Sequence, residues 1–109
     1  MSRTEQPGSF ELAQTTGGHA CRGALTFATA PQALKQTAGL FKDGGTALCF
    51  DLAGVERADS AGMALLIEWL RLAQEADIRL RYAHPPEHLQ AMARVSGLAE
   101  CLSPDPITD

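Results

Sequence analysis

The sequence TALCFDLAGVERADSAGMALLIEWLRLAQEA at positions 46–76 decides the fold. Its first seven residues, 46–52, are an almost unbroken apolar run of strand length, as expected of a strand that is covered on both faces. Residues 54–58 predict a short acidic turn. From Asp59 or Ser60 onward, apolar residues recur with helical spacing to the end of the stretch. We therefore expect a central strand, a turn and a long amphipathic helix.

The predicted helix carries apolar residues around much of its circumference. At 100° per residue they form two adjacent stripes that together cover roughly 200°, clearly more than the ~100° of a helix with one buried face. The first stripe comprises Met63, Leu66, Ile67, Leu70 and Ala73, and the second comprises Leu65, Trp69, Leu72 and Ala76. A sheet alone cannot cover both stripes. We expect the second either to pack under a neighbouring helix or to form a docking face for a partner.

The remaining arc of this helix is expected to face solvent. It comprises Ser60, Ala61, Ala64, Glu68, Arg71, Gln74 and Glu75. Ser60 opens this side at the first turn, where backbone N–H groups lack intrahelical partners and the peptide dipoles leave a partial positive charge. A cap by Asp59 is worth about 1 kcal/mol there. In the simplest interpretation, Asp59 and Ser60 do no more than cap the helix.

Length and composition limit what the chain can be. With 109 residues, of which 45% are apolar, it is expected to form one domain with one core. The net charge of −4 gives no basic field to attract nucleic acid. No run approaches the ~18 apolar residues of a membrane span, and residues 1–7 lack the apolar core of a secretory signal. We expect a cytoplasmic protein without direct membrane insertion.

Metal and cofactor sites are not expected. Cys21, Cys49 and Cys101 are far apart in the sequence and form no Cys-x-x-Cys motif, which argues against a disulfide framework and a zinc site. Cys49 is expected to be a small buried residue. His84 and His88 are four residues apart, but two prolines lie between them, and structural metal sites usually need four ligands. The chain is therefore expected to hold no metal and no cofactor.

The sequence also argues against an enzyme. Asp51, Glu56 and Asp59 invite comparison with the acidic cluster that holds Mg²⁺ in receiver domains. Receivers carry a further acidic pair after their first strand, and here residues 15–18 read Thr-Thr-Gly-Gly. Phosphate-binding glycine loops and the Gly-x-Ser-x-Gly nucleophile motif are absent from the sequence. No catalytic residue is predicted.

The rest of the chain supplies the neighbours of the central strand. Residues 9–26 predict a hairpin with paired glycines in its turn, and a strictly alternating strand is expected at 78–83. A first helix is expected after Thr29 and a third from Pro86 to Gly97. The order ββαβαβα predicts one α/β domain over 9–102, with a mixed sheet of four to five strands under amphipathic helices. Residues 1–8 and 103–109 are expected to be a flexible leader and tail.

Several segments resemble the signature of STAS domains, the family of sulfate-transporter tails and anti-sigma-factor antagonists. They are the strand 48–52, Val55 and the run Asp59-Ser60-Ala61-Gly62-Met63-Ala64-Leu65-Leu66. The segments Gly23-Ala24-Leu25 and Gly97-Leu98 also fit. The likeness covers residues 9–102 and implies the SpoIIAA-like fold of these domains. The small size and the continuation Ala64-Leu65-Leu66 resemble the MlaB-like branch, the stand-alone STAS components of Mla phospholipid-transport ABC systems.

The resemblance implies a non-catalytic function for the turn after the central strand. The family's functional position is the hydroxyl residue after the aspartate, here Ser60. Anti-sigma-factor antagonists are phosphorylated there by a serine kinase, whereas MlaB-like proteins bind the cytoplasmic ATPase, and through it the permease, at the inner membrane. The partner-binding residues implied are Asp59, Ser60, Ala61, Gly62, Ala64 and Glu68. Ala61 stands where many antagonists carry a second serine, which favours the transporter.

Overall fold

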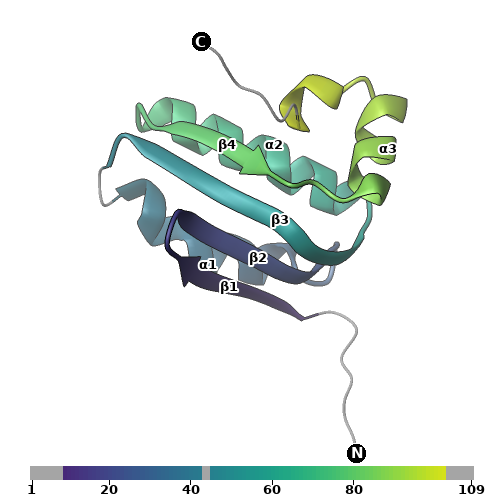
Figure 1. Ribbon diagram of the computed structural model, residues 1–109, viewed down its shortest axis with the longest axis horizontal. Coiled ribbons are helices and arrows are strands. Elements are labelled where there is room, and N and C mark those ends of the chain that lie inside the picture. Colours follow the sequence, from purple (N-terminus) through teal and green to yellow (C-terminus); the bar gives the residue numbers. More distant parts are fainter. Residues whose placement is uncertain (1–8, 43–44, 103–109) are drawn as a thin grey trace, which may run out of the picture.

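The computed structural model describes residues 9–42 and 45–102, so the predicted leader and tail lie outside the described residues. Figure 1 shows strands and helices in the order ββαβαβα, as predicted, followed by a short 3-10 helix. The elements are β1 (Phe10–Thr15), β2 (Gly18–Leu25), α1 (Ala30–Lys42), β3 (Ala47–Ala58), α2 (Ser60–Glu75), β4 (Arg79–Ala83), α3 (Glu87–Val95) and η1 (Ala99–Leu102).

The strands form one mixed sheet of four strands in the order β1-β2-β3-β4. β1 and β2 are the antiparallel hairpin expected from the paired glycines, and β2 pairs with β3 in parallel. β3 also pairs in parallel with β4, with Phe50 opposite Tyr82. β3 is therefore an inner strand, and β1 and β4 are the two edges. This arrangement confirms the predicted fold class.

β3 is longer than the sequence indicated. The predicted turn at 54–58 is wrong, because these residues continue the strand to Ala58. They pair with Arg22 to Leu25 of β2, and the register of the two strands shifts before Arg22 and again after Gly23. Val55 is buried, so it belongs to the core although charged residues follow it. The strand ends only where Asp59 begins the helix.

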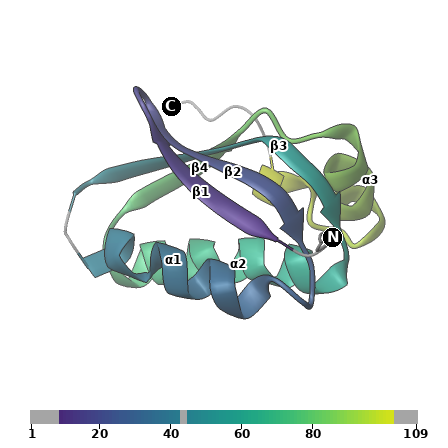
Figure 2. The ribbon, with the colours of Figure 1, turned by 90° about the horizontal axis from the view of Figure 1, so that it is seen from below.

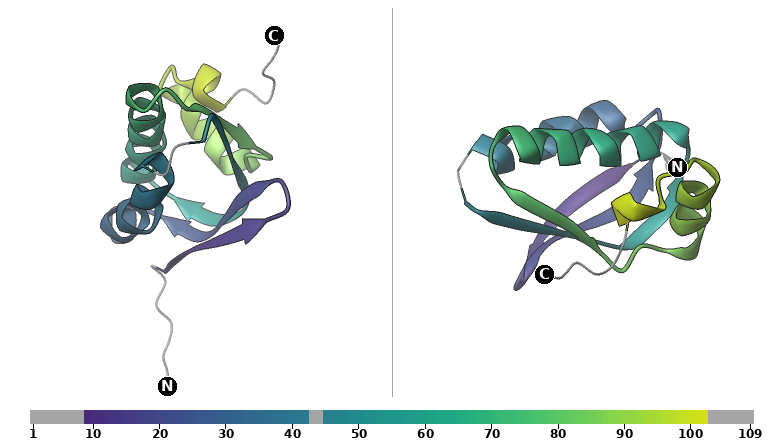
Figure 3. Two further views of the ribbon diagram at one scale, coloured as in Figure 1. Left: turned by 90° about the vertical axis from the view of Figure 1, so that its left-hand side faces the viewer. Right: turned by 90° about the horizontal axis from the view of Figure 1, so that it is seen from above.

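Two helices, α1 and α2, lie side by side on one face of the sheet (Figures 2 and 3). Between them, the fully buried Trp69 of α2 donates its indole N–H to Thr37 Oγ1 of α1 over 2.8 Å. Its ring also meets Phe50 of β3 edge-on, with centroids 5.0 Å apart. Leu65 and Trp69 of the second apolar stripe are thus buried and Leu72 is half-buried, which fits packing under a neighbouring helix, whereas Ala76 is exposed. The alternative, a docking face on Trp69, is excluded by this burial.

Two further residues differ from their predicted environments. Ile67, which was assigned to the first stripe, is 38% exposed, because the sheet and the neighbouring helices leave this side of α2 open. Cys49 is half-buried rather than buried. Cys21 is buried. This burial, and to a smaller extent the negative charge of Asp51, raises the pKa of its thiol to about 12.

The ends of α2 and α3 share one backbone arrangement. At the end of α3, Gly97 has φ 75° and Leu98 N donates to Ala93 O over 2.7 Å. At the end of α2, Asp77 has φ 62° and Ile78 N donates to Ala73 O over 2.8 Å. Both are Schellman motifs, in which a residue of left-handed conformation closes the helix. The sequence identified the first from its glycine and gave no such signal for the second.

Candidate functional site

The N-terminal end of α2 is held in place by one carboxylate. Asp59 has an extended backbone, and its Oδ1 accepts hydrogen bonds from the N–H groups of Ala61 (2.9 Å) and Gly62 (3.1 Å). Its Oδ2 accepts a third bond from Phe27 N over 3.2 Å, and its own N–H donates to Leu25 O. The predicted cap is present. In addition, it ties the helix to the loop between β2 and α1.

Gly62 allows this end of α2 to approach β2 closely. A Cβ atom at this position would lie 2.0 Å from Leu25 O and 2.8 Å from Leu25 C, well inside the contact distance of any side chain. Gly62 is buried, so it lies beneath the surface that the resemblance assigned to partner binding. Its contribution is to hold the first turn of α2 against the end of β2, and the surface above it therefore has a fixed shape.

Four of the other predicted partner-binding residues reach the surface to different degrees. Ser60 and Ala64 are exposed, whereas Ala61 and Glu68 are half-buried. Helical spacing places Ser60, Ala64 and the exposed Ile67 on one face. In the part of the chain that the structure describes, no hydrogen bond from the Ser60 side chain is found. The structure thus presents a serine hydroxyl to solvent on a small, largely apolar face.

Phe27 extends this face beyond α2. Its side chain is 81% exposed, and its backbone is bonded to the same Asp59 carboxylate that caps the helix. Exposed aromatic rings are enriched at protein interfaces. Phe27 was not among the residues predicted from the sequence. The available signal was its position: it follows the buried end of β2, in the short loop before α1, where the alternation of the strand no longer directs it inward.

A polar cluster borders the face farther along α2. Arg71 forms ion pairs with the half-buried Glu68 and the exposed Glu75 on the same helix. The hydrogen bonds from Arg71, then its positive charge, hold the pKa of the Glu68 carboxyl below its usual value. The pairing with Glu68 and Glu75 raises the pKa of Arg71. The cluster therefore forms a polar boundary to the apolar face.

This chemistry favours binding over catalysis. A nucleophilic serine requires an adjacent base within hydrogen-bond distance. Among the described residues, none that could act as a base is hydrogen-bonded to Ser60. What the site does offer is an exposed hydroxyl, three apolar side chains and a fixed backbone. We call this surface, made of Phe27, Ser60, Ala64 and Ile67, the Ser60 face.

The acidic cluster of the receiver comparison does not form. Asp51 lies within β3 and accepts a hydrogen bond from Ala53 N, and it faces His84 with Nδ1 and Oδ1 3.4 Å apart. The extended strand separates Asp51 from Asp59 by on the order of 25 Å. Within 9–42 and 45–102, no group of three or more His, Cys, Asp or Glu could hold a metal ion.

Among the described helices, none combines the length and the apolar character needed to cross a membrane.

Comparisons with known proteins agree with this architecture. A family model described as "Mlab, STAS domain" matches residues 15–104. A search of curated proteins finds no match for the chain.

Two solved structures share the fold. The unphosphorylated form of the anti-sigma factor antagonist SpoIIAA is similar with a TM-score of 0.68 and 19% identity, over 90% of this chain and 89% of that one. An anti-sigma factor antagonist from Mycobacterium paratuberculosis is similar with a TM-score of 0.62 and 21% identity, over 93% of this chain and 87% of that one. At such identities the likeness extends to the fold alone.

Proposed function

The chain belongs to the STAS domain family, and from this premise we propose that it is a non-catalytic accessory subunit of an inner-membrane ABC transporter that moves phospholipids. It binds the cytoplasmic ATPase subunit through the Ser60 face and reaches the permease, and hence the membrane, only through that ATPase. The matching family model carries the name Mlab, which supports a transporter over other uses of the fold.

The observation that carries this proposal is the construction of the Ser60 face. Phe27 and Ile67 are exposed on a backbone that Asp59 and Gly62 hold rigid. A preorganised surface loses little conformational entropy on binding, and an exposed aromatic side chain provides an anchor. The polar cluster of Arg71 and its two glutamates then forms the rim. This arrangement suits stable attachment to a folded partner.

Holding the ATPase is also the way in which such a domain regulates. A subunit that binds one conformation of its partner more tightly shifts the partner toward that conformation by the difference in affinity. The domain needs no reaction of its own for this effect. We expect the ATPase rate and the amount of assembled transporter to depend on occupancy of the Ser60 face.

Substitution of Ser60 tests this function. Ser60→Arg places a charge in the centre of the contact, where an unpaired buried charge costs several kcal/mol, so we expect binding to weaken by at least about tenfold. Folding stability should change by less than about 0.5 kcal/mol because the position is exposed. The measurement is recovery of the ATPase and permease by affinity purification at native expression.

Ser96→Arg provides the matched control, because Ser96 is also an exposed serine and lies at the end of α3. It should recover the transporter as the unmodified chain does. If Ser60→Arg also recovers the ATPase at the unmodified level while remaining folded, the Ser60 face is not the contact.

A second function, that of an anti-sigma-factor antagonist, is supported by the similar solved structures. In this case a serine kinase binds the same face and phosphorylates Ser60, whose hydroxyl is accessible. A phosphate there would sit beside the Asp59 carboxylate, which already accepts from Ala61 N and Gly62 N. Few helix N–H groups remain to stabilise it, and the added charge would oppose burial in an interface. Phosphorylation would therefore release the partner.

Purification distinguishes the two functions. An ATPase and a permease in the eluate support the transporter. A serine kinase in the eluate, together with a phosphate on Ser60 by mass spectrometry, supports the antagonist.

A further inference from the structure

The opposite end of α2 lies beside β4, an edge strand of the sheet. β4 pairs only with β3 among the described strands, and Arg79 N donates to Thr46 O next to that ladder. Because backbone groups alternate in direction along a strand, the N–H and C=O of Leu80 point away from β3. Such unpaired edge groups are able to accept a further strand. The length of α2, about 24 Å for 16 residues, separates this edge from the Ser60 face.

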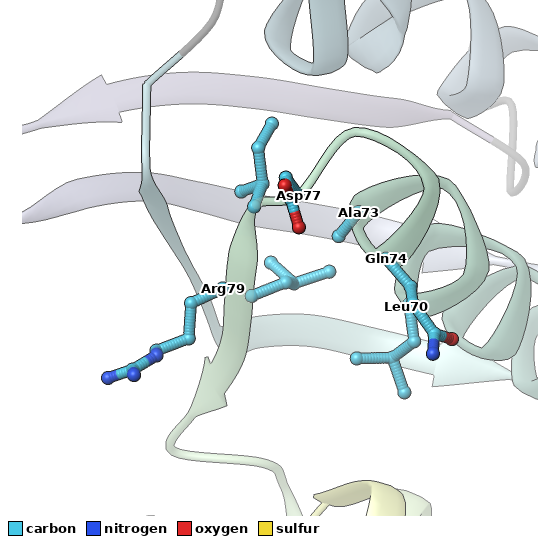
Figure 4. Close-up of a pocket in the computed structure, with 7 residues that line it drawn as sticks. Leu70, Ala73, Gln74, Asp77 and Arg79 are labelled. Carbon is cyan, nitrogen blue, oxygen red and sulfur yellow. The ribbon is translucent and has the colours of Figure 1, made fainter.

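A groove with apolar and polar lining residues accompanies this edge. It has a volume of about 540 Å³ and lies between the last turns of α2 and the start of β4 (Figure 4). Leu70, Ala73 and Gln74 line it from the helix, Asp77 and Ile78 line it from the turn after the helix, and Arg79 and Leu80 line it from the strand. Side chains of an added strand that point toward α2 would enter this groove, since alternate residues of a strand face the same side.

The other side of β4 is positively charged. Arg79 and Arg81 are exposed, and Figure 4 shows Arg79 directed away from the helix. No ion pair of either arginine is found within the described part of the chain. An added strand would place its outward side chains beside these arginines. Carboxylates at those positions would be attracted and cations repelled.

We propose that β4 is a second docking site, which binds an extended segment of a partner protein with alternating acidic and apolar residues as a fifth strand. The apolar residues enter the groove beside Leu70 and Leu80, and the acidic residues pair with Arg79 and Arg81. This mode of peptide binding obtains affinity from the main chain and specificity from alternate side chains. It is independent of the Ser60 face and does not require the function proposed above.

A second copy of the chain fits this edge poorly. Antiparallel pairing of two β4 strands about Leu80 would place Arg79 of one copy opposite Arg81 of the other. Like charges directly opposite each other are destabilising. The charges of β4 therefore favour an acidic partner over self-association.

The test uses a fluorescent six-residue peptide of alternating glutamate and valine with the full chain. Binding is followed by anisotropy and by hydrogen exchange at the Leu80 amide. We expect the glutamate peptide to bind about tenfold more tightly than its lysine analogue at low salt. Protection of the Leu80 amide should appear on binding, and N-methylation of the peptide at its pairing positions should abolish both signals.

Charge reversal separates pairing with β4 from general attraction. The double variant Arg79→Glu/Arg81→Glu should prefer the lysine peptide, whereas the control Arg57→Glu, at an exposed position at the far end of β3, should keep the original preference. Equal binding of both peptides, or binding that tolerates N-methylation, would overturn the docking site.

A Leu80 amide that is already protected from hydrogen exchange in the free chain would also overturn the docking site. If this protection disappears on removal of residues 103–109, the chain's own tail occupies the edge. If it increases with protein concentration, a second copy does.

Discussion

The two ends of α2 differ in the structure that surrounds them. At the N-terminal end, Asp59 accepts three backbone hydrogen bonds and Gly62 fits against Leu25, so the structure around Ser60 is fixed. At the C-terminal end, the helix closes on Asp77 in a left-handed conformation and leaves a groove beside an edge strand. One end presents side chains on a rigid backbone, and the other presents the backbone itself. The same helix can therefore offer two kinds of binding surface.

The largest effect that tests this comparison is expected from Gly62→Ala. Its Cβ would meet Leu25 O at 2.0 Å, so either α2 or β2 must move. Overpacking of this kind costs roughly 1–3 kcal/mol, and backbone neighbours yield less than side chains. Chemical denaturation should show a free energy of unfolding lower by at least this amount.

Gly39→Ala is the matched control, because Gly39 lies in α1 with no atom within 4 Å of its Cβ position. The same substitution should there raise the free energy of unfolding by roughly 0.5–1 kcal/mol, since glycine is unfavourable within a helix. If Gly62→Ala is as stable as the unmodified chain, the N-terminal end of α2 is not as tightly fixed as the contacts indicate.

Truncation of the cap is expected to have the next largest effect. Asp59→Ala removes the acceptor for Ala61 N, Gly62 N and Phe27 N, and should lower the free energy of unfolding by roughly 0.5–2 kcal/mol. Hydrogen exchange should reveal where the loss occurs. Faster exchange at Phe27 as well as in the first turn would show that one carboxylate holds both segments. Acceleration confined to α2 would argue that the bond to the loop contributes nothing.

Part of this site and of the strand before it could be predicted from the sequence. The position of Asp59, the exposure of Ser60 and the strand-helix order all follow from local rules, namely capping chemistry and the period of apolar residues. The length of β3 did not follow, because pairing with β2 overrides the polar composition of residues 54–58. Long-range pairing of this kind leaves no local pattern.

The residues that complete the Ser60 face were missed for a related reason. Phe27 reaches it through a backbone bond to a residue 32 positions away, which no periodicity reveals. Ile67 has the spacing of a core residue, and its exposure depends on where the neighbouring elements end. Gly62 could be singled out as part of a motif, but its close contact with Leu25 requires the packed structure.

At the other end of α2, Asp77→Gly should have a smaller effect of opposite sign. Asp77 occupies the left-handed position of a Schellman motif, where glycine is the usual residue. Relief of this conformation should raise the free energy of unfolding by up to about 1 kcal/mol. Gly97→Asp makes the reverse exchange in the same motif at the end of α3 and should lower stability by a similar amount. Thermal unfolding of the two variants checks both signs.

The smallest effect concerns the polar cluster between the two ends. Arg71 holds the pKa of Glu68 below the ordinary value of 4.5, so the folded state binds a proton at this carboxyl less readily than the unfolded state. The resulting stabilisation is present above the unfolded pKa and is lost as the pH falls through the folded pKa. Because the pair is exposed, the stabilisation should be slight.

Carbon-detected NMR titration of Glu68 is therefore the measurement to use, and its midpoint should rise toward the ordinary value in Arg71→Met. Arg94→Met serves as the control, since Arg94 pairs with Glu87 on α3 and should leave Glu68 unchanged. High salt should reduce the difference between the unmodified chain and Arg71→Met, because exposed pairs are screened. A midpoint that is the same in both proteins would mean that Arg71 does not pair with Glu68 in solution. The rim of the Ser60 face would then be free to make its ion pairs with a partner instead.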